Sequence, residues 1–261
     1  MNEFLFEKCL KESGEVGFIE RVFPSLVYVS GLPSVHPSEL VVFETGQMGQ
    51  VLSLSEEYVE ILLFSVSDMP VGTRVARTSQ FLQVQVGQGL LGAVIDPLGK
   101  SYGNYSKPKI MTETRYVDIL PRGLETRAAV REPMETGTSI VDLVIPLGRG
   151  QRELVLGDRK TGKTSFLLHT LLNQAKKGTI CIYAAVGKRQ VDIKHVCDFV
   201  KEKSIDSKVI IVASGASESS GLVFMTPYTA MTIAEYFKDQ GEHVLLIIDD
   251  LTSHAQYYRE I

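Results

Sequence analysis

Residues 154–165 read Leu-Val-Leu-Gly-Asp-Arg-Lys-Thr-Gly-Lys-Thr-Ser and contain a complete phosphate-binding loop at 157–164. The apolar residues before the loop predict a strand, and the periodic residues after it predict a helix. In such a unit the glycines allow backbone N–H groups to close around phosphate oxygens, Lys163 reaches the terminal phosphates, and the Thr164 hydroxyl can bind Mg²⁺. The helix points its positive N-terminal end at the same anion. The sequence therefore predicts a nucleotide site, the alternative being a glycine turn that binds nothing.

A second motif supplies the other half of this site. The apolar run at 244–248, Val-Leu-Leu-Ile-Ile, is followed by Asp249 and Asp250. A buried strand of this kind brings a carboxylate to the C-terminal edge of a parallel sheet, where the loop also lies. We expect Asp249 to orient Mg²⁺ opposite Thr164, directly or through water. By itself an apolar run ending in Asp-Asp is a common strand end, so the assignment depends on the loop.

The chain from residue 152 onward alternates apolar runs with amphipathic stretches. In one of these stretches Ile193, Val196, Cys197 and Val200 share a helix face. Strands are predicted at 153–156, 180–185, 208–213 and 243–248, and helices at 164–176, 191–202 and 222–240. This alternation is typical of a parallel α/β domain.

The first part of the chain has a different pattern, with short β-branched runs separated by turn residues. The runs lie at 16–22, 26–30, 39–44, 50–54, 59–65 and 73–77. Short strands at this spacing predict a small closed barrel, the alternative being an open sheet packed on the next domain. We therefore divide the chain into a barrel domain, 1–79, and a nucleotide-binding domain, 80–261, whose first part to residue 150 is a connector.

Composition excludes several classes of protein. Of the 261 residues 44% are hydrophobic, which supports a core, and neither a membrane-spanning run nor a secretory signal is recognisable. Residues 1–80 carry 11 acidic and 5 basic side chains, the opposite of what a nucleic-acid backbone attracts. The chain has three cysteines, Cys9, Cys181 and Cys197. Because their number is odd and their spacing matches no cysteine motif, we expect reduced thiols, with a reactive cysteine as the alternative.

Three stretches, 148–165, 91–99 and 244–251, resemble the alpha subunit of the F-type ATP synthase, and the match runs from about Gly14 to the last residue. The catalytic beta subunit has Gly-Glu-Arg where this chain has Gly-Lys-Arg at 187–189, and Asp-Asn where it has Asp-Asp at 249–250. The resemblance implies a six-stranded barrel, then a RecA-like nucleotide-binding domain, then a helical C-terminal domain.

The resemblance also implies a function and partners. Alpha and beta subunits alternate in a hetero-hexameric ring around a rotating central stalk, held by a peripheral stalk, in a rotary ATP synthase that transports hydrogen ions. Catalysis lies mostly on beta, and the alpha site binds ATP and Mg²⁺ without catalysing. The complex lies on the cytoplasmic face of an energy-transducing membrane, a bacterial plasma membrane or its organelle equivalent, and alpha is peripheral to it. No nucleic acid partner is expected.

The resemblance places nucleotide contacts on the loop and on the strand end, with Thr164 and Asp249 as Mg²⁺ ligands. The candidate contacts are Gly157, Asp158, Arg159, Lys160, Thr161, Gly162, Lys163, Thr164, Ser165 and Asp249. The family usually has glutamine where this chain has Lys160 and Lys188, so these two positions depart from it. The family's N-terminal helix is mostly missing before Gly14.

The sequence predicts no catalytic residue. Related ATPases carry a glutamate at the end of the strand after the loop helix, where this chain reads Val-Gly-Lys-Arg-Gln at 186–190, and the next acidic residue is Asp192. Without a base to position water, hydrolysis is expected to be negligible. Lys188 is expected either to face the terminal phosphate or to point into solvent.

The chain ends at Ile261, before the arginine that alpha subunits insert into the site of beta, before the adenine contacts and before the helical domain. In RecA-like sheets the next strand lies between the Asp249 strand and the loop strand. We therefore expect an incomplete alpha subunit with a gap in the sheet.

Two other functions fit the RecA-like core. An RNA-dependent hexameric translocase of the transcription terminator type would need a basic, aromatic N-terminal domain, which the acidic first segment disfavours. A secretion or flagellar ATPase would be an enzyme in its own right and should carry a glutamate where Lys188 stands.

Overall fold

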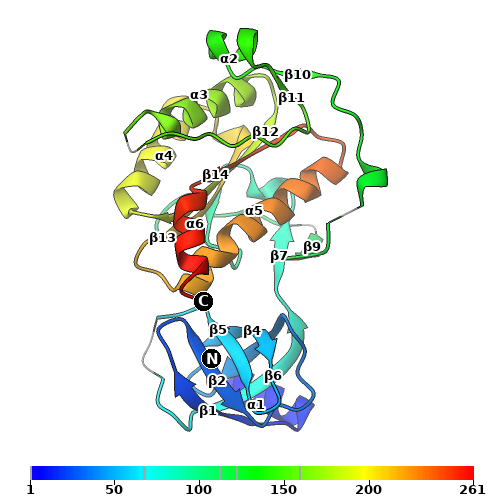
Figure 1. The fold of residues 1–261 in the computed structure, drawn as a ribbon, viewed down its shortest axis with the longest axis vertical. Helices are drawn as coiled ribbons and strands as arrows, with labels where there is room; N and C mark the ends of the chain where they lie inside the picture. The colour runs from blue at the N-terminus through cyan, green and yellow to red at the C-terminus, as the bar shows by residue number, and fades with distance from the viewer. Residues whose placement is uncertain (1, 67–68, 112, 122, 159) are drawn as a thin grey trace.

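The computed structural model describes residues 2–66, 69–111, 113–121, 123–158 and 160–261. Figure 1 shows a barrel at one end of the molecule and an α/β unit at the other, joined through β7. The barrel closes in the order β1-β2-β5-β4-β3-β6, with β6 pairing back onto β1. Its elements, in chain order, are α1 (Asn2–Ser13), β1 (Gly17–Val22), β2 (Leu26–Ser30), β3 (Glu39–Phe43), β4 (Met48–Leu54), β5 (Val59–Leu63) and β6 (Arg74–Phe81). The predicted barrel is confirmed over the open sheet.

The barrel is filled by alternate side chains of its strands, among them Val41, Phe43 and Ile61, all fully buried. Glu39 on β3 is 1% exposed, and the Arg77 guanidinium on β6 donates to its two oxygens at 3.0 and 3.1 Å. This bidentate pair ties the two strands together. Helix α1 packs on the outside of β3 and β6.

The connector contains more regular structure than its sequence predicts. It holds two antiparallel ribbons, β7 with β9 and β10 with β11, and a short strand, β8, that joins the main sheet. Its elements are β7 (Gln83–Val86), η1 (Gln88–Leu90), β8 (Val94–Ile95), β9 (Glu113–Tyr116), η2 (Leu124–Thr126), β10 (Pro133–Met134), α2 (Ser139–Val144) and β11 (Leu147–Gly148). The boundary proposed between residues 79 and 80 falls inside β6, and the domain limits stay a prediction.

The main sheet is parallel, in the order β14-β12-β13-β8, with helices on both faces. Along β12, Ile182 and Ala184 belong to the core formed with α5, whereas Cys181 and Tyr183 belong to the core formed with α3 and α4. A strand covered on both faces is apolar throughout, which is why these strands could be recognised from sequence. The elements are α3 (Lys163–Lys176), β12 (Ile180–Lys188), α4 (Gln190–Glu202), η3 (Asp206–Lys208), β13 (Val209–Gly215), α5 (Ser220–Asp239), β14 (Val244–Asp249) and α6 (Leu251–Tyr258). All three cysteines are free and buried.

The strand predicted immediately before the phosphate loop is absent, and that prediction is wrong. Residues 151–158 have no regular secondary structure, and Leu154 and Leu156 are 62% and 81% exposed. Within the described residues β14 pairs only with β12, so its other edge has no strand beside it. A strand forms only where its backbone groups find a ladder partner, and this segment has none. Strand β14 is therefore an edge strand among the described residues, and the gap expected between it and a loop strand stays a prediction.

Among the residues that the structure describes, none of the helices has both the length and the apolar character needed to cross a membrane.

Candidate nucleotide site

The phosphate loop leads directly into α3, whose N-cap is Gly162. Gly162 has a φ of 92°, in the left-handed region that only glycine adopts readily. A Cβ on Gly157 would lie 2.8 Å from Thr161 Oγ1, so a side chain at 157 would collide with the loop. Both glycines of the motif are thus required by the turn. The Thr161 hydroxyl donates to the Asp158 carbonyl at 2.8 Å and holds the turn from inside.

The loop lysine lies across the turn it follows. Lys163 Nζ donates to the carbonyl oxygens of Gly157 and Asp158, each at 2.6 Å. This places its ammonium group beside the backbone that the motif predicts as the phosphate cradle. Lys160 is exposed with a φ of 64°, and Arg159 lies outside the described residues.

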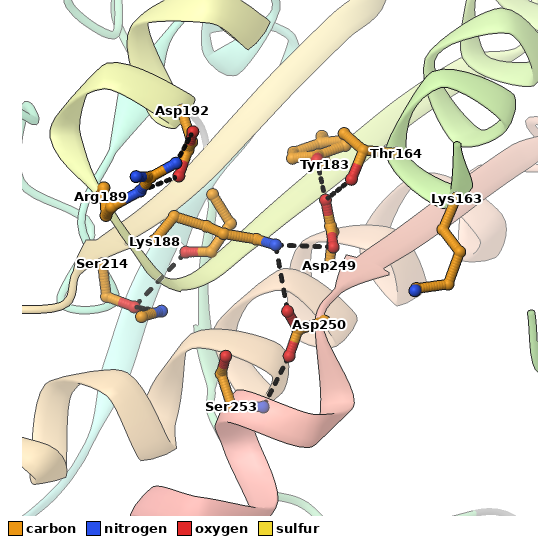
Figure 2. A network of polar contacts seen from close by, with 12 residues as sticks. Lys163, Thr164, Tyr183, Lys188, Arg189, Asp192, Ser214, Asp249, Asp250 and Ser253 are labelled. Carbon is orange, nitrogen blue, oxygen red and sulfur yellow. Dashed lines mark hydrogen bonds and ion pairs between the residues drawn. The ribbon is translucent and has the colours of Figure 1, made fainter. Parts of the chain in front are cut away.

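A polar network joins α3, β12 and β14 at the C-terminal edge of the sheet (Figure 2). Asp249, which is 6% exposed, accepts at Oδ2 from the Thr164 hydroxyl at 3.1 Å and from the Tyr183 hydroxyl at 2.6 Å. Lys188 Nζ donates to Asp249 Oδ1 at 2.8 Å. The structure thus brings together the predicted pair, Thr164 and Asp249, from segments 85 residues apart.

Asp250 extends this network to the next helix. Its Oδ2 accepts from Lys188 at 3.1 Å, and its Oδ1 accepts from the Ser253 backbone N–H at 2.6 Å, which makes Asp250 the N-cap of α6. Lys188 therefore lies between two carboxylates, and its side chain is 19% exposed. The expectation that Lys188 points into solvent is wrong, because its side chain lies against the end of β14, and the expectation that it faces the terminal phosphate stays a prediction.

Burial and neighbouring charges shift the pKa values of Lys188, Tyr183 and Asp250. Burial lowers the pKa of Lys188, but its hydrogen bond and charge interactions with Asp249 and Asp250 outweigh burial, so the net pKa is raised. Burial and then the neighbouring charge of Asp249 raise the pKa of Tyr183, which stays a hydrogen-bond donor. Burial alone would raise the pKa of Asp250. The hydrogen bond from the Ser253 N–H and the charge of Lys188 together lower this pKa by more, so its net shift is downward. One ammonium thus faces two carboxylates.

A cavity of about 350 Å³ opens beside the network, between α3, β12 and α4. Of the predicted contacts, Thr164, Ser165 and Asp249 line it, whereas Gly157, Asp158, Thr161, Gly162 and Lys163 form the loop turn. Asp192 also lines this cavity, but Arg189 holds it in a bidentate pair at 2.9 and 3.0 Å. Within the described residues, the carboxylates bonded to Lys188 are those of Asp249 and Asp250.

Two members of the network were missed in the sequence. Tyr183 is a polar hydroxyl in the middle of an otherwise apolar strand, and that contrast was the available signal. Asp250 was noted only as part of the Asp-Asp pair. Its place before a helix-forming stretch, 251–258, is the usual signal of an N-cap.

A loop of this composition at the start of a helix, with an aspartate at the end of a neighbouring parallel strand, defines a P-loop nucleotide-binding domain. Residues 137–261 match the family described as ATP synthase alpha/beta family, nucleotide-binding domain.

The chain as a whole is related to ATP synthase alpha subunits. It is 38% identical to ATP synthase subunit alpha of Rickettsia bellii, over 97% of this chain and 51% of that protein. It is 41% identical to ATP synthase subunit alpha 2 of Cereibacter sphaeroides, over 96% of this chain and 50% of that protein. It is 38% identical to ATP synthase subunit alpha 1 of Paraburkholderia xenovorans, over 94% of this chain and 48% of that protein. The chain thus spans about half the length of the curated relatives it matches.

Proposed function

We propose that this chain acts as an alpha subunit of a rotary ATP synthase and binds Mg-ATP at a non-catalytic, regulatory site. The observation that carries the proposal is the contact between Thr164 Oγ1 and Asp249 Oδ2 at 3.1 Å, at the edge where the phosphate loop enters α3. These are the two side chains that P-loop proteins use around Mg²⁺.

The residues present fit a magnesium ion. Hydroxyl and carboxylate oxygens are the ligand types that Mg²⁺ takes, and Thr164 and Asp249 supply one of each. Mg²⁺, when bound, would neutralise charge on the nucleotide phosphates. Gly157, Gly162 and Lys163 would hold the phosphates through backbone N–H groups and the ammonium.

The site is proposed to bind without hydrolysing. Hydrolysis needs a group that positions and polarises water, and Lys188 stands at the strand end where a base is expected. Asp192, the next acidic residue, is paired with Arg189 and half exposed. Lys188 also disfavours a secretion or flagellar ATPase, which should carry a glutamate at this position.

The wider role rests on the names of the relatives. In this proposal the chain alternates with beta subunits in a hetero-hexameric ring, contacts central and peripheral stalk subunits, and serves a complex that makes ATP from ADP and phosphate while transporting hydrogen ions. It would reach the membrane only through that complex, as a peripheral subunit on the cytoplasmic face.

The nucleotide site is tested by titrating the purified chain with a fluorescent ATP analogue in the presence of Mg²⁺. Lys163→Ala should weaken binding at least about tenfold, because one charge-assisted contact to phosphate contributes about 1.5 to 3 kcal/mol. Lys176→Ala, an exposed lysine in the last turn of the same helix, is the matched control and should bind as the wild type does.

The two variants should show the same circular dichroism. Equal affinity in the wild type and Lys163→Ala would contradict the site. Steady ATP turnover by the chain, lost in Lys163→Ala, would contradict its non-catalytic character.

A further inference from the structure

The ammonium group of Lys188 lies beside the two carboxylates at the end of β14. Strand β12 pairs with β14 in parallel up to Ala185 opposite Asp249, and β12 continues three residues further. Its last side chain therefore reaches over the end of β14, where Nζ lies 2.8 Å from Asp249 Oδ1 and 3.1 Å from Asp250 Oδ2. Figure 2 shows the lysine lying between these two carboxylates.

Both oxygens of Asp249 already have donors. Oδ2 accepts from Thr164 and Tyr183, and Oδ1 accepts from Lys188. A divalent cation that takes either oxygen must displace one of these donors or share the oxygen with it. At Oδ1 it would meet an ammonium group, and two positive charges on one carboxylate oxygen repel strongly where water is partly excluded.

We infer that Lys188 is a built-in counter-ion that competes with divalent cations for Asp249 and Asp250 and makes nucleotide binding at this site less dependent on Mg²⁺. The inference rests on the proposed nucleotide site and names how that site is regulated. When metal is scarce, the ammonium offsets one of the two negative charges of Asp249 and Asp250, so that these carboxylates repel the phosphates of free ATP less. When metal is abundant, Lys188 weakens the binding of the metal to Asp249 and Asp250.

The decisive variant is Lys188→Gln, which removes the positive charge but keeps a hydrogen-bond donor of similar length. The control is Lys194→Gln, which removes an equal charge from an exposed position on α4. A third variant, Lys188→Arg, keeps the charge. Thermal unfolding of each variant establishes that it is folded.

The first measurement is Mn²⁺ binding to the nucleotide-free 261-residue chain by electron paramagnetic resonance. We expect weak binding in the wild type, Lys188→Arg and Lys194→Gln, and binding at least about tenfold tighter in Lys188→Gln. Micromolar Mn²⁺ binding by the wild type would overturn the inference without any variant, and so would equal binding by folded Lys188→Gln and wild type.

The second measurement is the ratio of ATP dissociation constants in EDTA and in excess Mg²⁺. We expect a ratio of a few-fold in the wild type and a ratio about tenfold larger in Lys188→Gln. Equal ratios would overturn the inference. If none of the chains binds ATP in either condition, the proposed function fails, while the Mn²⁺ measurement still decides the role of Lys188.

Discussion

The barrel and the main sheet differ in how their strands find partners. In the barrel every strand has two neighbours, because β6 closes onto β1. In the sheet, β14 has one neighbour within the described residues, and the segment before the phosphate loop, 151–158, forms no strand. An apolar run is therefore not sufficient for a strand, since a strand also needs a partner along its edge.

The closure of the barrel can be broken at Glu39. We expect Glu39→Ala to destabilise the barrel by about 2 to 4 kcal/mol, because it removes the bidentate partner of the Arg77 guanidinium and leaves it only the longer ion pair with Glu15, at 3.8 Å. The variant also removes the acceptor of the Ser79 backbone N–H, now bonded at 2.8 Å. Urea unfolding followed by circular dichroism measures the loss. Glu20→Ala, at an exposed barrel position, is the control, and a loss below about 1 kcal/mol in Glu39→Ala would show that the pair does not hold the barrel closed.

The open edge of the sheet can be measured by hydrogen exchange. We expect the slowest amides of β14 to exchange about a hundredfold faster than the slowest amides of β4 and β5, because a strand at an edge opens locally whereas a closed barrel opens only as a whole. Exchange followed by mass spectrometry on peptides from residues 48–63 and 243–249 makes the comparison. Equal protection of the two regions would mean that the unpaired edge of β14 has no energetic consequence.

Alkaline pH should weaken the α/β unit. Burial raises the pKa of the Cys181 thiol to about 12 and that of Cys197 to about 11, from a usual value of 9.0. A raised folded-state pKa gives a contribution that is complete below pH 9 and is lost as pH rises through 11 and 12. Between pH 8 and 10.5 we expect each thiol to reduce the free energy of unfolding by about 1 to 2 kcal/mol.

The measurement is the urea midpoint at the two pH values. The double variant Cys181→Ala, Cys197→Ala should be less stable at pH 8 and should lose the part of the pH dependence that the two thiols contribute. The remainder is expected from other groups with a raised pKa, among them Tyr102 and Tyr183. An unchanged pH dependence in that variant would assign the alkaline loss to other groups.

Much of the fold could be predicted because it depends on local pattern. The six barrel strands, helices α3 to α5 and strands β12 to β14 follow the apolar periodicity of their own residues. The contact between Thr164 and Asp249 could also be predicted, because carboxyl ends of parallel strands meet at one edge.

The rest depends on neighbours that a linear pattern does not contain. The segment 153–156 has the composition of a strand, but its pairing is decided by what lies beside β14. Strand β8 has two residues, too few to show any period. The contacts of Lys188 depend on a strand end 61 residues away, so its charge was visible in the sequence but its partners were not.

Asp250 takes part in two interactions with different parts of the chain, the ion pair with Lys188 on β12 and the N-cap of α6. It shares Lys188 with Asp249 and also caps the first turn of α6 through Ser253. Whatever draws Lys188 away leaves the full negative charge of Asp250 at the positive end of that helix. The thermodynamic coupling runs both ways: strengthening or weakening the first turn of α6 alters how tightly the strand end holds its lysine. The helix is thus a reporter of what occupies the strand end, and a label on α6 would read that occupancy at a distance.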